Sequence, residues 1–280
     1  MRNLLLSSQR LNKLEQCPRL FFFEHELNKV PVEKPKYFVE GEFVHSILEH
    51  YYTSKINNTV DLDSTIEFAR NKATELEITI EESEILLKLF LDYLSFHSNE
   101  SWVIEGAEVP FAKVLFEDAS KDIRVIIQGK VDLLATSKEG IPLIIDHKVV
   151  SQNRQTYERD NQILLYCWAL ERNDFIINQL GKQKTLPPKD KFRRQYFNVP
   201  SHLIEEWKEG TIWKALELLR FHELNYYPHR YSSCNFQGRK CTFYEVCNGT
   251  KDTWEYRLEG NFTTKEDYDL MAGAEIDENP

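Results

Sequence analysis

Charged side chains that could do chemistry interrupt two apolar runs within residues 124–150 of this sequence. Asp132 lies in the first run, and Asp146 and Lys148 lie in the second. Apolar residues on both sides of the turn-forming stretch 136–140 predict a β-hairpin. Because residues two apart share one face of a strand, Asp146 and Lys148 would converge with Asp132 from the neighbouring strand. Two carboxylates beside an ammonium group could bind a divalent metal ion and activate a water molecule.

The alternative explanation of these charges is a structural ion pair at a strand end, or a turn capped by Asp132. A charge in an apolar strand is costly to bury unless a metal ion or a substrate compensates it. The apolar residues on both sides of Asp146 therefore favour the chemical interpretation.

A predicted helix over residues 39–52 supplies a further candidate ligand. Gly41, His45 and Glu49 are spaced four residues apart, so they share one face of this helix. Gly41 leaves room one turn away from the histidine for another backbone or a ligand. His45 could bind a metal ion, with Glu49 as an additional candidate, although a single histidine on a helix is more often structural or on the surface.

Two other segments could extend the same site. A predicted strand over residues 102–116 carries Glu108, which is either a third carboxylate of the site or a charge on an edge strand. A predicted helix over residues 160–171 carries Gln162 and Tyr166 four residues apart, so both can point toward the same end of the sheet.

The remaining pattern predicts the elements that surround these residues. Helices are expected after Ser7 or Ser8, over residues 62–98 and over residues 201–224, and strands are expected at residues 174–180 and 193–199. The strands that carry the charged residues therefore lie between helical segments of the chain.

The composition indicates a globular protein of 280 residues, 41% of them hydrophobic. This length suits one large domain with a substantial core. The amino terminus has too short an apolar run for a signal peptide, and no stretch approaches the length of a membrane span. We therefore expect a cytoplasmic protein, in which five cysteines favour metal or cluster ligation over disulfides.

Four of the five cysteines lie toward the two ends of the chain. Cys17 precedes a proline, and Cys234, Cys241 and Cys247 are separated by six and five residues, which is too wide for the close pairs of a common zinc finger. Cys167 lies in an apolar helical stretch and is expected to be a buried core residue.

The net charge of −10 is unevenly distributed along the chain. Residues 251–280 carry nine acidic and three basic side chains, and we expect them to form an acidic, weakly ordered tail. Residues 181–194 hold six basic residues against one acidic residue. This run is either a solvated loop or a local positive surface.

Taken in order, these residues resemble the RecB-like branch of the PD-(D/E)XK nuclease superfamily, especially its iron-sulfur members, namely CRISPR-associated exonucleases, AddB-type helicase-nuclease subunits and related phage exonucleases. Four segments carry the resemblance: 41–49 is similar to the helical histidine motif, 129–132 and 145–148 to the acidic core, and 162–166 to the Gln-x-x-x-Tyr motif. Cys17 followed by proline, with three cysteines near the other end, is similar to the split cluster signature. The last three cysteines are more often closer together in the family, and Asp146 stands where many members have Glu.

The resemblance implies a restriction-endonuclease-like α/β core with a central mixed β-sheet flanked by helices, an N-terminal helical region and a C-terminal cysteine segment. One nuclease domain would span residues 1–250, before the acidic tail. Within it, the helical region, the catalytic core, and the C-terminal helix with the cysteine segment would occupy residues 40–100, 101–200 and 201–250.

The resemblance also assigns roles to the candidate residues. Mg²⁺ or Mn²⁺ would be bound by His45, Asp132, Asp146 and the backbone carbonyl of His147, with Glu108 and Glu49 as further candidates. Lys148 would orient the attacking water and offset developing negative charge. Gln162 and Tyr166 would position the scissile phosphate or the water.

For the cysteines, the resemblance implies a 4Fe-4S cluster held by Cys17, Cys234, Cys241 and Cys247. The alternative is a structural Zn²⁺ ion at the same four thiolates, or with His229 replacing one of them.

The implied activity is that of a metal-dependent DNA exonuclease in recombination, repair, or phage or CRISPR DNA processing. It would act on single strands or duplex ends, with a helicase or a recombination protein as a candidate partner and no membrane. The candidate phosphate-binding side chains are Lys182, Lys184, Lys191, Arg193, Arg194 and Arg154. The alternatives are a catalytically silent nucleic-acid-binding or scaffold protein with a nuclease fold, and a structure- or sequence-specific endonuclease.

Overall fold

The computed structural model describes residues 2–151, 157, 159–183, 185–236, 238–265, 274 and 276–277. The chain forms two compact units, each built from segments that are distant in sequence. The first unit comprises Met1–Lys34, Ala112–Gly129 and Glu205–Pro280, and the second comprises Pro35–Phe111 and Lys130–Ile204. No helix in these described ranges has the length and apolar character needed to cross a membrane.

The central sheet is mixed. Its strands are β1 (Arg2–Leu6), β3 (Val103–Asp118), β4 (Ile123–Thr136), β5 (Pro142–Val150), β6 (Asp174–Gly181), β7 (Arg194–Asn198) and β11 (Ile276–Asp277). Hydrogen bonds connect them in the order β11-β3-β4-β5-β6-β7, with β1 beside β4. The β4–β5 and β6–β7 pairs are antiparallel, and the β5–β6 pair is parallel. Together with the flanking helices, this mixed sheet confirms the predicted α/β fold class.

The predicted hairpin is present as β4 and β5. Leu133 pairs with Ile145 and Thr136 pairs with Pro142. Gly140 closes the turn at φ +83°, a conformation that suits a residue without a side chain, and its N–H donates to the Ser137 carbonyl at 3.0 Å. The apolar runs on both strands are buried, so the alternating pattern correctly predicted this element.

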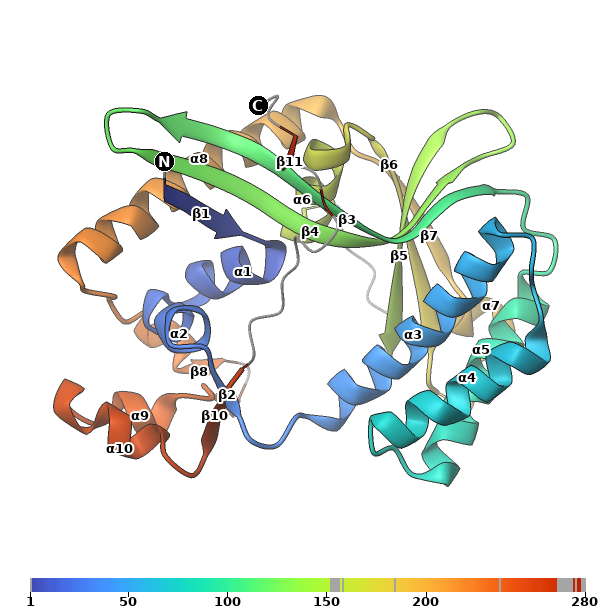
Figure 1. The fold of residues 1–280 in the computed structure, drawn as a ribbon, viewed down its shortest axis with the longest axis horizontal. Helices are drawn as coiled ribbons and strands as arrows, with labels where there is room; N and C mark the ends of the chain where they lie inside the picture. Colours follow the sequence, from blue (N-terminus) through green and yellow to red (C-terminus); the bar gives the residue numbers. More distant parts are fainter. Residues whose placement is uncertain are drawn as a thin grey trace. The chain divides into compact units, whose positions relative to one another are not determined.

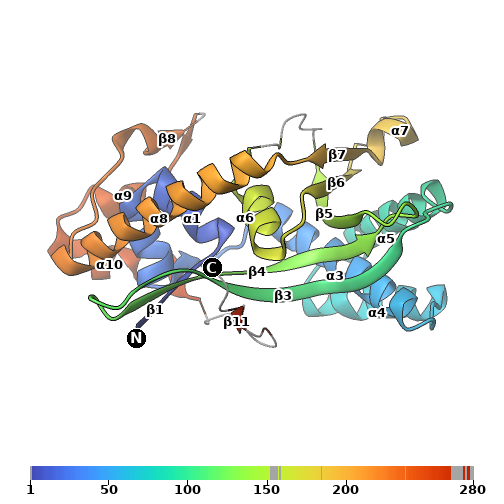
Figure 2. The same cartoon turned by 90° about the horizontal axis from the view of Figure 1, so that it is seen from above.

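The second unit places three helices over its part of the sheet. These helices are α3 (Lys36–Ile56), α4 (Leu62–Glu75) and α5 (Ile80–Phe96), and the same unit contains α6 (Asn161–Leu170) and α7 (Pro188–Lys191). Figures 1 and 2 show α3, α4 and α5 packed side by side. Their apolar faces share one core with Leu133, Ile145 and Ile176 of the sheet. This core fixes α3 against the hairpin.

The helical stretch expected over residues 62–98 is two helices. Leu76 ends α4, Glu77 adopts φ 54°, and the Thr79 side chain then accepts a hydrogen bond from Glu82 N–H as the N-cap of α5. Apolar spacing continues through this break, which is why periodicity alone did not reveal it.

The first unit begins with β1, which pairs in parallel with the first half of β4. The helices and strands that follow are α1 (Ser8–Gln16), α2 (Pro18–Phe21), the π-helix η1 (Phe22–Glu26), β2 (Lys29–Pro31), η2 (Tyr231–Ser233), β8 (Asn235–Phe236), β9 (Arg239–Lys240), α9 (Tyr244–Cys247), η3 (Lys251–Thr253), α10 (Trp254–Leu258) and β10 (Phe262–Thr264). The Ser7 side chain caps α1, as predicted. The long helix α8 (Ser201–Leu224) contributes residues to both units.

The described part of the expected acidic tail differs from the prediction. Residues 251–265 contain η3, α10 and β10, and β10 pairs antiparallel with β2. Leu258 is buried in a core with Phe23 and Phe243. The high charge of this segment obscured its few apolar anchors, because composition averages over residues that face opposite sides.

Candidate active site

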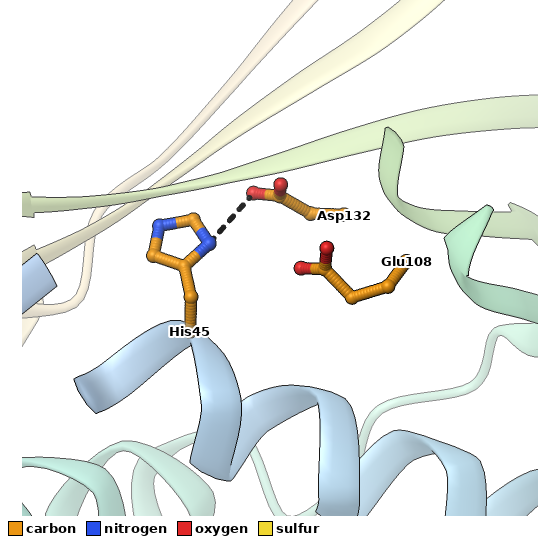
Figure 3. A group of neighbouring side chains, drawn as sticks. All are labelled: His45, Glu108 and Asp132. Atoms are coloured by element: carbon orange, nitrogen blue, oxygen red, sulfur yellow. Dashed lines mark ion pairs between the residues drawn. The ribbon is translucent and has the colours of Figure 1, made fainter. Parts of the chain in front are cut away.

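Three side chains from three elements of the second unit meet at one point. They are His45 on α3, Glu108 on β3 and Asp132 on β4, and their ligand atoms all lie within 4.8 Å of one another. Figure 3 shows the imidazole and both carboxylates turned toward one another. His45 Nδ1 lies 3.4 Å from Asp132 Oδ2. An imidazole and two carboxylates at these distances could bind a metal ion.

Glu108 is placed by an unusual backbone conformation. Its φ of 49° lies in the left-handed region, although it belongs to strand β3. A residue with a side chain is strained there, and such residues concentrate where a strand must redirect a functional side chain. Burial and then the charge of Asp132 raise the pKa of Glu108, while the ammonium of Lys130, 2.6 Å away, opposes this shift. Of the two interpretations offered by the sequence, the geometry therefore favours a third carboxylate.

His45 and Asp132 shift each other's pKa in opposite directions. Burial alone would lower the pKa of His45, but the adjacent Asp132 carboxylate raises it to about 9. Burial alone would raise the pKa of Asp132, but the His45 charge and hydrogen bond outweigh burial and lower it. Without a metal ion, the pair is therefore an imidazolium beside a carboxylate.

Asp146 and Lys148 on β5 form a second charged pair in this unit. Asp146 is 1% exposed, and Lys148 Nζ lies 2.7 Å from its Oδ2. No donor among the described residues makes a well-aligned hydrogen bond to either Asp146 oxygen. Burial raises the pKa of Asp146 to about 6, against the opposing charge of Lys148. Besides its ion pair with Lys148, this carboxylate has acceptor positions left for a further cation.

Lys148 begins a row of hydrogen bonds that includes the two residues predicted on α6. Lys148 Nζ donates to Gln162 Oε1 at 2.8 Å, and Gln162 Nε2 donates to the Tyr166 hydroxyl at 3.0 Å. The Tyr166 hydroxyl donates to the Lys130 carbonyl at 2.8 Å. Asp160 caps α6 and so fixes where Gln162 emerges. The structure thus brings Gln162 and Tyr166 to the lysine, as their spacing suggested.

The His147 imidazole is not part of the three-ligand group, although its ring centroid lies 6.4 Å from that of His45. The backbone N–H of His147 donates to Asp132 Oδ2 at 2.6 Å, which orients that carboxylate. Its imidazole is buried, with Nδ1 2.7 Å from Asn178 Nδ2, and burial lowers its pKa to about 3. The imidazole is therefore a neutral structural group, and a ligand role of the His147 carbonyl stays a prediction.

Asn178 was not predicted from the sequence. It is a fully buried amide on β6, and its Nδ2 also approaches the Tyr93 hydroxyl at 2.9 Å. Two adjacent amides, Asn178 and Gln179, in the otherwise apolar run 175–180 were the available signal, but the partners of Asn178 are distant in sequence.

Glu49 does not join the three-ligand group. It is exposed on α3, and it is absent from the set of ligand atoms that lie within 4.8 Å of one another in the described structure. Spacing on a helix face placed it near His45 but could not fix its distance from the sheet.

Two of the lysines in the basic run 181–194 form ion pairs, which makes them less available to phosphate than the sequence suggested. Lys182 pairs with Glu40, and Lys191 lies 3.6 Å from Asp92. Arg193 is half-buried just before β7. Two other candidate phosphate ligands, Lys184 and Arg154, lie outside the described residues.

Arg194 belongs to an internal polar network. Its Nη2 donates to the Tyr93 hydroxyl at 3.0 Å and pairs with Glu100, which is itself buried. Its guanidinium lies 4.0 Å from the centroid of the Trp102 ring. These contacts favour a structural role for Arg194 over a phosphate contact.

The four cysteines expected to act together line one cavity in the first unit, beside His229. They are Cys17, Cys234, Cys241 and Cys247, called the cysteine site below. The Arg230 backbone N–H lies 3.4 Å from Cys17 Sγ, a contact that suits a thiolate ligand. Burial raises the pKa of Cys247 to about 12, so its thiol stays protonated unless a metal or cluster binds. The donor set fits a metal or a cluster.

Cys167 lies apart from the cysteine site. It is buried on α6, and burial raises its pKa to about 12. This agrees with the expectation of a core cysteine.

Comparisons with known proteins agree with this fold. The chain is similar to a solved structure of a candidate exonuclease from Eubacterium rectale, at 12% identity, with 96% of this chain and 92% of that chain covered and a TM-score of 0.51. It is also similar to the solved structure of SSO0001, at 14% identity over 75% of each chain, with a TM-score of 0.37. No curated protein matches the sequence. At 12% identity, the Eubacterium rectale structure shows the fold alone.

A family comparison identifies the superfamily, because the match covers most of the chain. The model of the PD-(D/E)XK nuclease superfamily matches residues 5–248, a range that includes both the three-ligand group and the cysteine site. This chain belongs to the PD-(D/E)XK nuclease superfamily.

Proposed function

We propose that this protein is a DNA exonuclease that depends on Mg²⁺ or Mn²⁺. The observation that carries the proposal is the convergence of His45, Glu108 and Asp132, three metal-binding side chains from separate elements. A carboxylate-rich site suits these hard cations, and the imidazole makes Mn²⁺ more acceptable than an all-oxygen site would. Asp146 is the fourth candidate ligand, because its buried carboxylate has unused acceptor positions.

A divalent metal bound there supplies Lewis acidity and a water of lowered pKa. The protein side chains supply orientation and charge. Lys148 carries a positive charge held in place by Asp146 and Gln162, and this charge offsets negative charge that develops on the phosphate. Burial alone would lower the pKa of Lys148, but the charges of Asp146 and Asp132 raise it, so the ammonium stays protonated.

In this proposal, Gln162 and Tyr166 are positioning residues that hold Lys148 in place. The Tyr166 hydroxyl is anchored on the Lys130 carbonyl and receives a hydrogen bond from the Gln162 amide. The amide oxygen in turn accepts from Lys148. The row therefore holds the lysine in one direction while a substrate phosphate binds.

The test compares wild type with Asp132→Asn and Glu108→Gln on labelled linear duplex, circular duplex and single-stranded DNA, with Mg²⁺ or Mn²⁺. An exonuclease degrades linear DNA and spares circles, and each substitution lowers the rate by at least about 100-fold. Glu139→Gln, which changes an exposed carboxylate in the hairpin turn, is the matched control and keeps full activity.

Other outcomes identify the rival functions. Cleavage of circles at one or a few positions would indicate an endonuclease. An inert wild type that still binds DNA would indicate a scaffold protein with a nuclease fold.

We also propose that the cysteine site binds a 4Fe-4S cluster. Four thiols from opposite ends of the chain line one cavity there, and this split arrangement is similar to the cluster signature that the sequence resembles. A role in recombination, repair, or phage or CRISPR DNA processing, with a helicase or recombination partner, follows from family resemblance and is part of the same proposal.

A further inference from the structure

A second cavity in the first unit lies beside the cysteine site and is separate from it in most of its lining. It measures about 230 Å³ and is lined by ten residues, none of which is a carboxylate. Its polar lining includes Arg19, His229, Lys251 and the indole of Trp254. In a chain of net charge −10, a cavity with two permanent positive charges and no acidic side chain is suited to an anion.

Arg19 is the central feature of this cavity. It is 9% exposed, and no carboxylate of the described residues pairs with it. Its Nε donates to the Tyr227 carbonyl at 2.7 Å, and its Nη1 lies 3.0 Å from His229 Nε2. A guanidinium has five N–H groups, so three remain without a protein acceptor in the described structure. Burying a guanidinium whose N–H groups are only partly paired is costly unless a bound anion accepts hydrogen bonds from the remaining ones.

Trp254 supplies a second unused donor. Its ring lies 4.8 Å from the Arg19 guanidinium, and its Nε1 is buried without a hydrogen-bond acceptor among the described residues. An indole N–H can only donate. Unused N–H groups on two side chains of the same cavity indicate an acceptor-rich ligand.

The rim of the cavity adds an exposed positive charge and an aromatic ring. Lys251 is exposed and has no ion pair in the described structure. Tyr226 is 57% exposed, so one face of its ring is available for stacking. Cavities for whole small molecules usually exceed 300 Å³. This one is better matched to a phosphate group and part of its sugar than to a complete cofactor.

We propose that this cavity binds a backbone phosphate of a DNA strand through Arg19, Trp254 and Lys251, with a base against Tyr226. The choice of DNA as the source of the phosphate rests on the proposed nuclease function. The site is a substrate-binding contact outside the metal-binding residues.

The competing explanation is that Arg19 only balances the thiolates of the cysteine site, because its charge acts on Cys247. That explanation gives no use for the Trp254 donor or for Lys251. Variants of these two residues therefore separate the two explanations.

The experiment measures binding of a short, 3′-labelled oligothymidylate by fluorescence anisotropy in EDTA, which prevents cleavage. Lys251→Ala should weaken binding about tenfold at low salt and reduce the slope of log affinity against log salt by about 0.7, the value for one lost phosphate contact on a single strand. Trp254→Phe keeps an aromatic ring and removes the N–H together with part of the indole, so it should weaken binding about fivefold with an unchanged slope. Lys138→Ala, at an exposed lysine in the hairpin turn, is the control and should bind like wild type.

Arg19 itself is tested by Arg19→Met and Arg19→Lys, with visible absorbance as a check on the cysteine site. The methionine variant should lose at least tenfold in affinity, and the lysine variant should recover part of it. Inorganic phosphate at the same concentration should compete far more weakly than unlabelled oligothymidylate.

Wild-type affinity and salt slope in both Lys251→Ala and Trp254→Phe would overturn the proposal, and so would equal competition by inorganic phosphate. These results are independent of the nuclease assay, because binding is measured in EDTA, where no cleavage occurs. Loss of binding in the cavity variants of a protein that cleaves no DNA would support the cavity and refute the nuclease activity.

Discussion

Asp146 combines deep burial with a single compensating charge. Its carboxylate is 1% exposed and relies on the Lys148 ammonium at 2.7 Å. Removing one member of a buried ion pair is much more costly than removing both, because the survivor stays charged without a partner. We expect Lys148→Met to lower the free energy of unfolding by about 3 kcal/mol in EDTA, measured by urea denaturation. The double variant with Asp146→Asn should regain most of this loss.

A lysine of similar chemistry on an exposed surface provides the control. Lys88 is 73% exposed and pairs with Asp92 four residues later on α5. Such pairs contribute at most about 0.5 kcal/mol, so Lys88→Met should unfold almost like wild type. Equal effects of the two substitutions, or no recovery in the double variant, would show that Asp146 is not held as an anion by Lys148.

At the scale of elements, two adjacent arginines where β7 begins, Arg193 and Arg194, have different roles. Arg194 joins β7 to α5 through the Tyr93 hydroxyl and the buried Glu100 carboxylate. Arg193 contributes its backbone carbonyl to Gln179 N–H, a bond that survives truncation of the side chain. We therefore expect Arg194→Ala to cost about 3 kcal/mol of stability and Arg193→Ala to cost less than about 0.5 kcal/mol.

The two substitutions should have the opposite order of effect on DNA binding. Arg193→Ala should reduce the salt slope for single-stranded DNA by about 0.7, whereas Arg194→Ala should leave the slope unchanged at temperatures where it is folded. Both properties are measured on the same preparations, by urea denaturation and by anisotropy. A changed slope in Arg194→Ala with wild-type stability would restore the original interpretation of Arg194 as a phosphate ligand.

The hairpin and the helices were predictable because their patterns are local. Alternation gave β4 and β5, and spacing of four placed Gln162 and Tyr166 on one face of α6. The left-handed backbone at Glu108 was not predictable, because no glycine or asparagine marks it. The partners of Arg194 were equally hidden, since Tyr93 and Glu100 lie about a hundred residues earlier and only the folded sheet brings them together.

At the scale of the whole molecule, both compact units are assembled from distant parts of the chain. In the first unit, the cysteine site joins Cys17 to residues more than two hundred positions later. Closing so long a loop removes much conformational freedom from the unfolded chain. The apolar core around this site is small, with Phe23, Phe243 and Leu258 among its buried members. A bound cluster would therefore contribute a large share of the stability of this unit.

Breaking the cysteine site should therefore remove the cluster and destabilise the first unit. Anaerobically purified wild type should be brown and contain iron and acid-labile sulfide, and Cys234→Ser should lose both and unfold at a denaturant concentration clearly below that of wild type. Cys167→Ala is the matched control: it removes a buried thiol outside the cysteine site and should keep the colour and the iron. A colourless wild type that contains one zinc ion per chain would show that the cysteine site binds a structural zinc ion in place of a cluster. A Cys234→Ser variant with the colour and stability of wild type would exclude Cys234 from the ligand set.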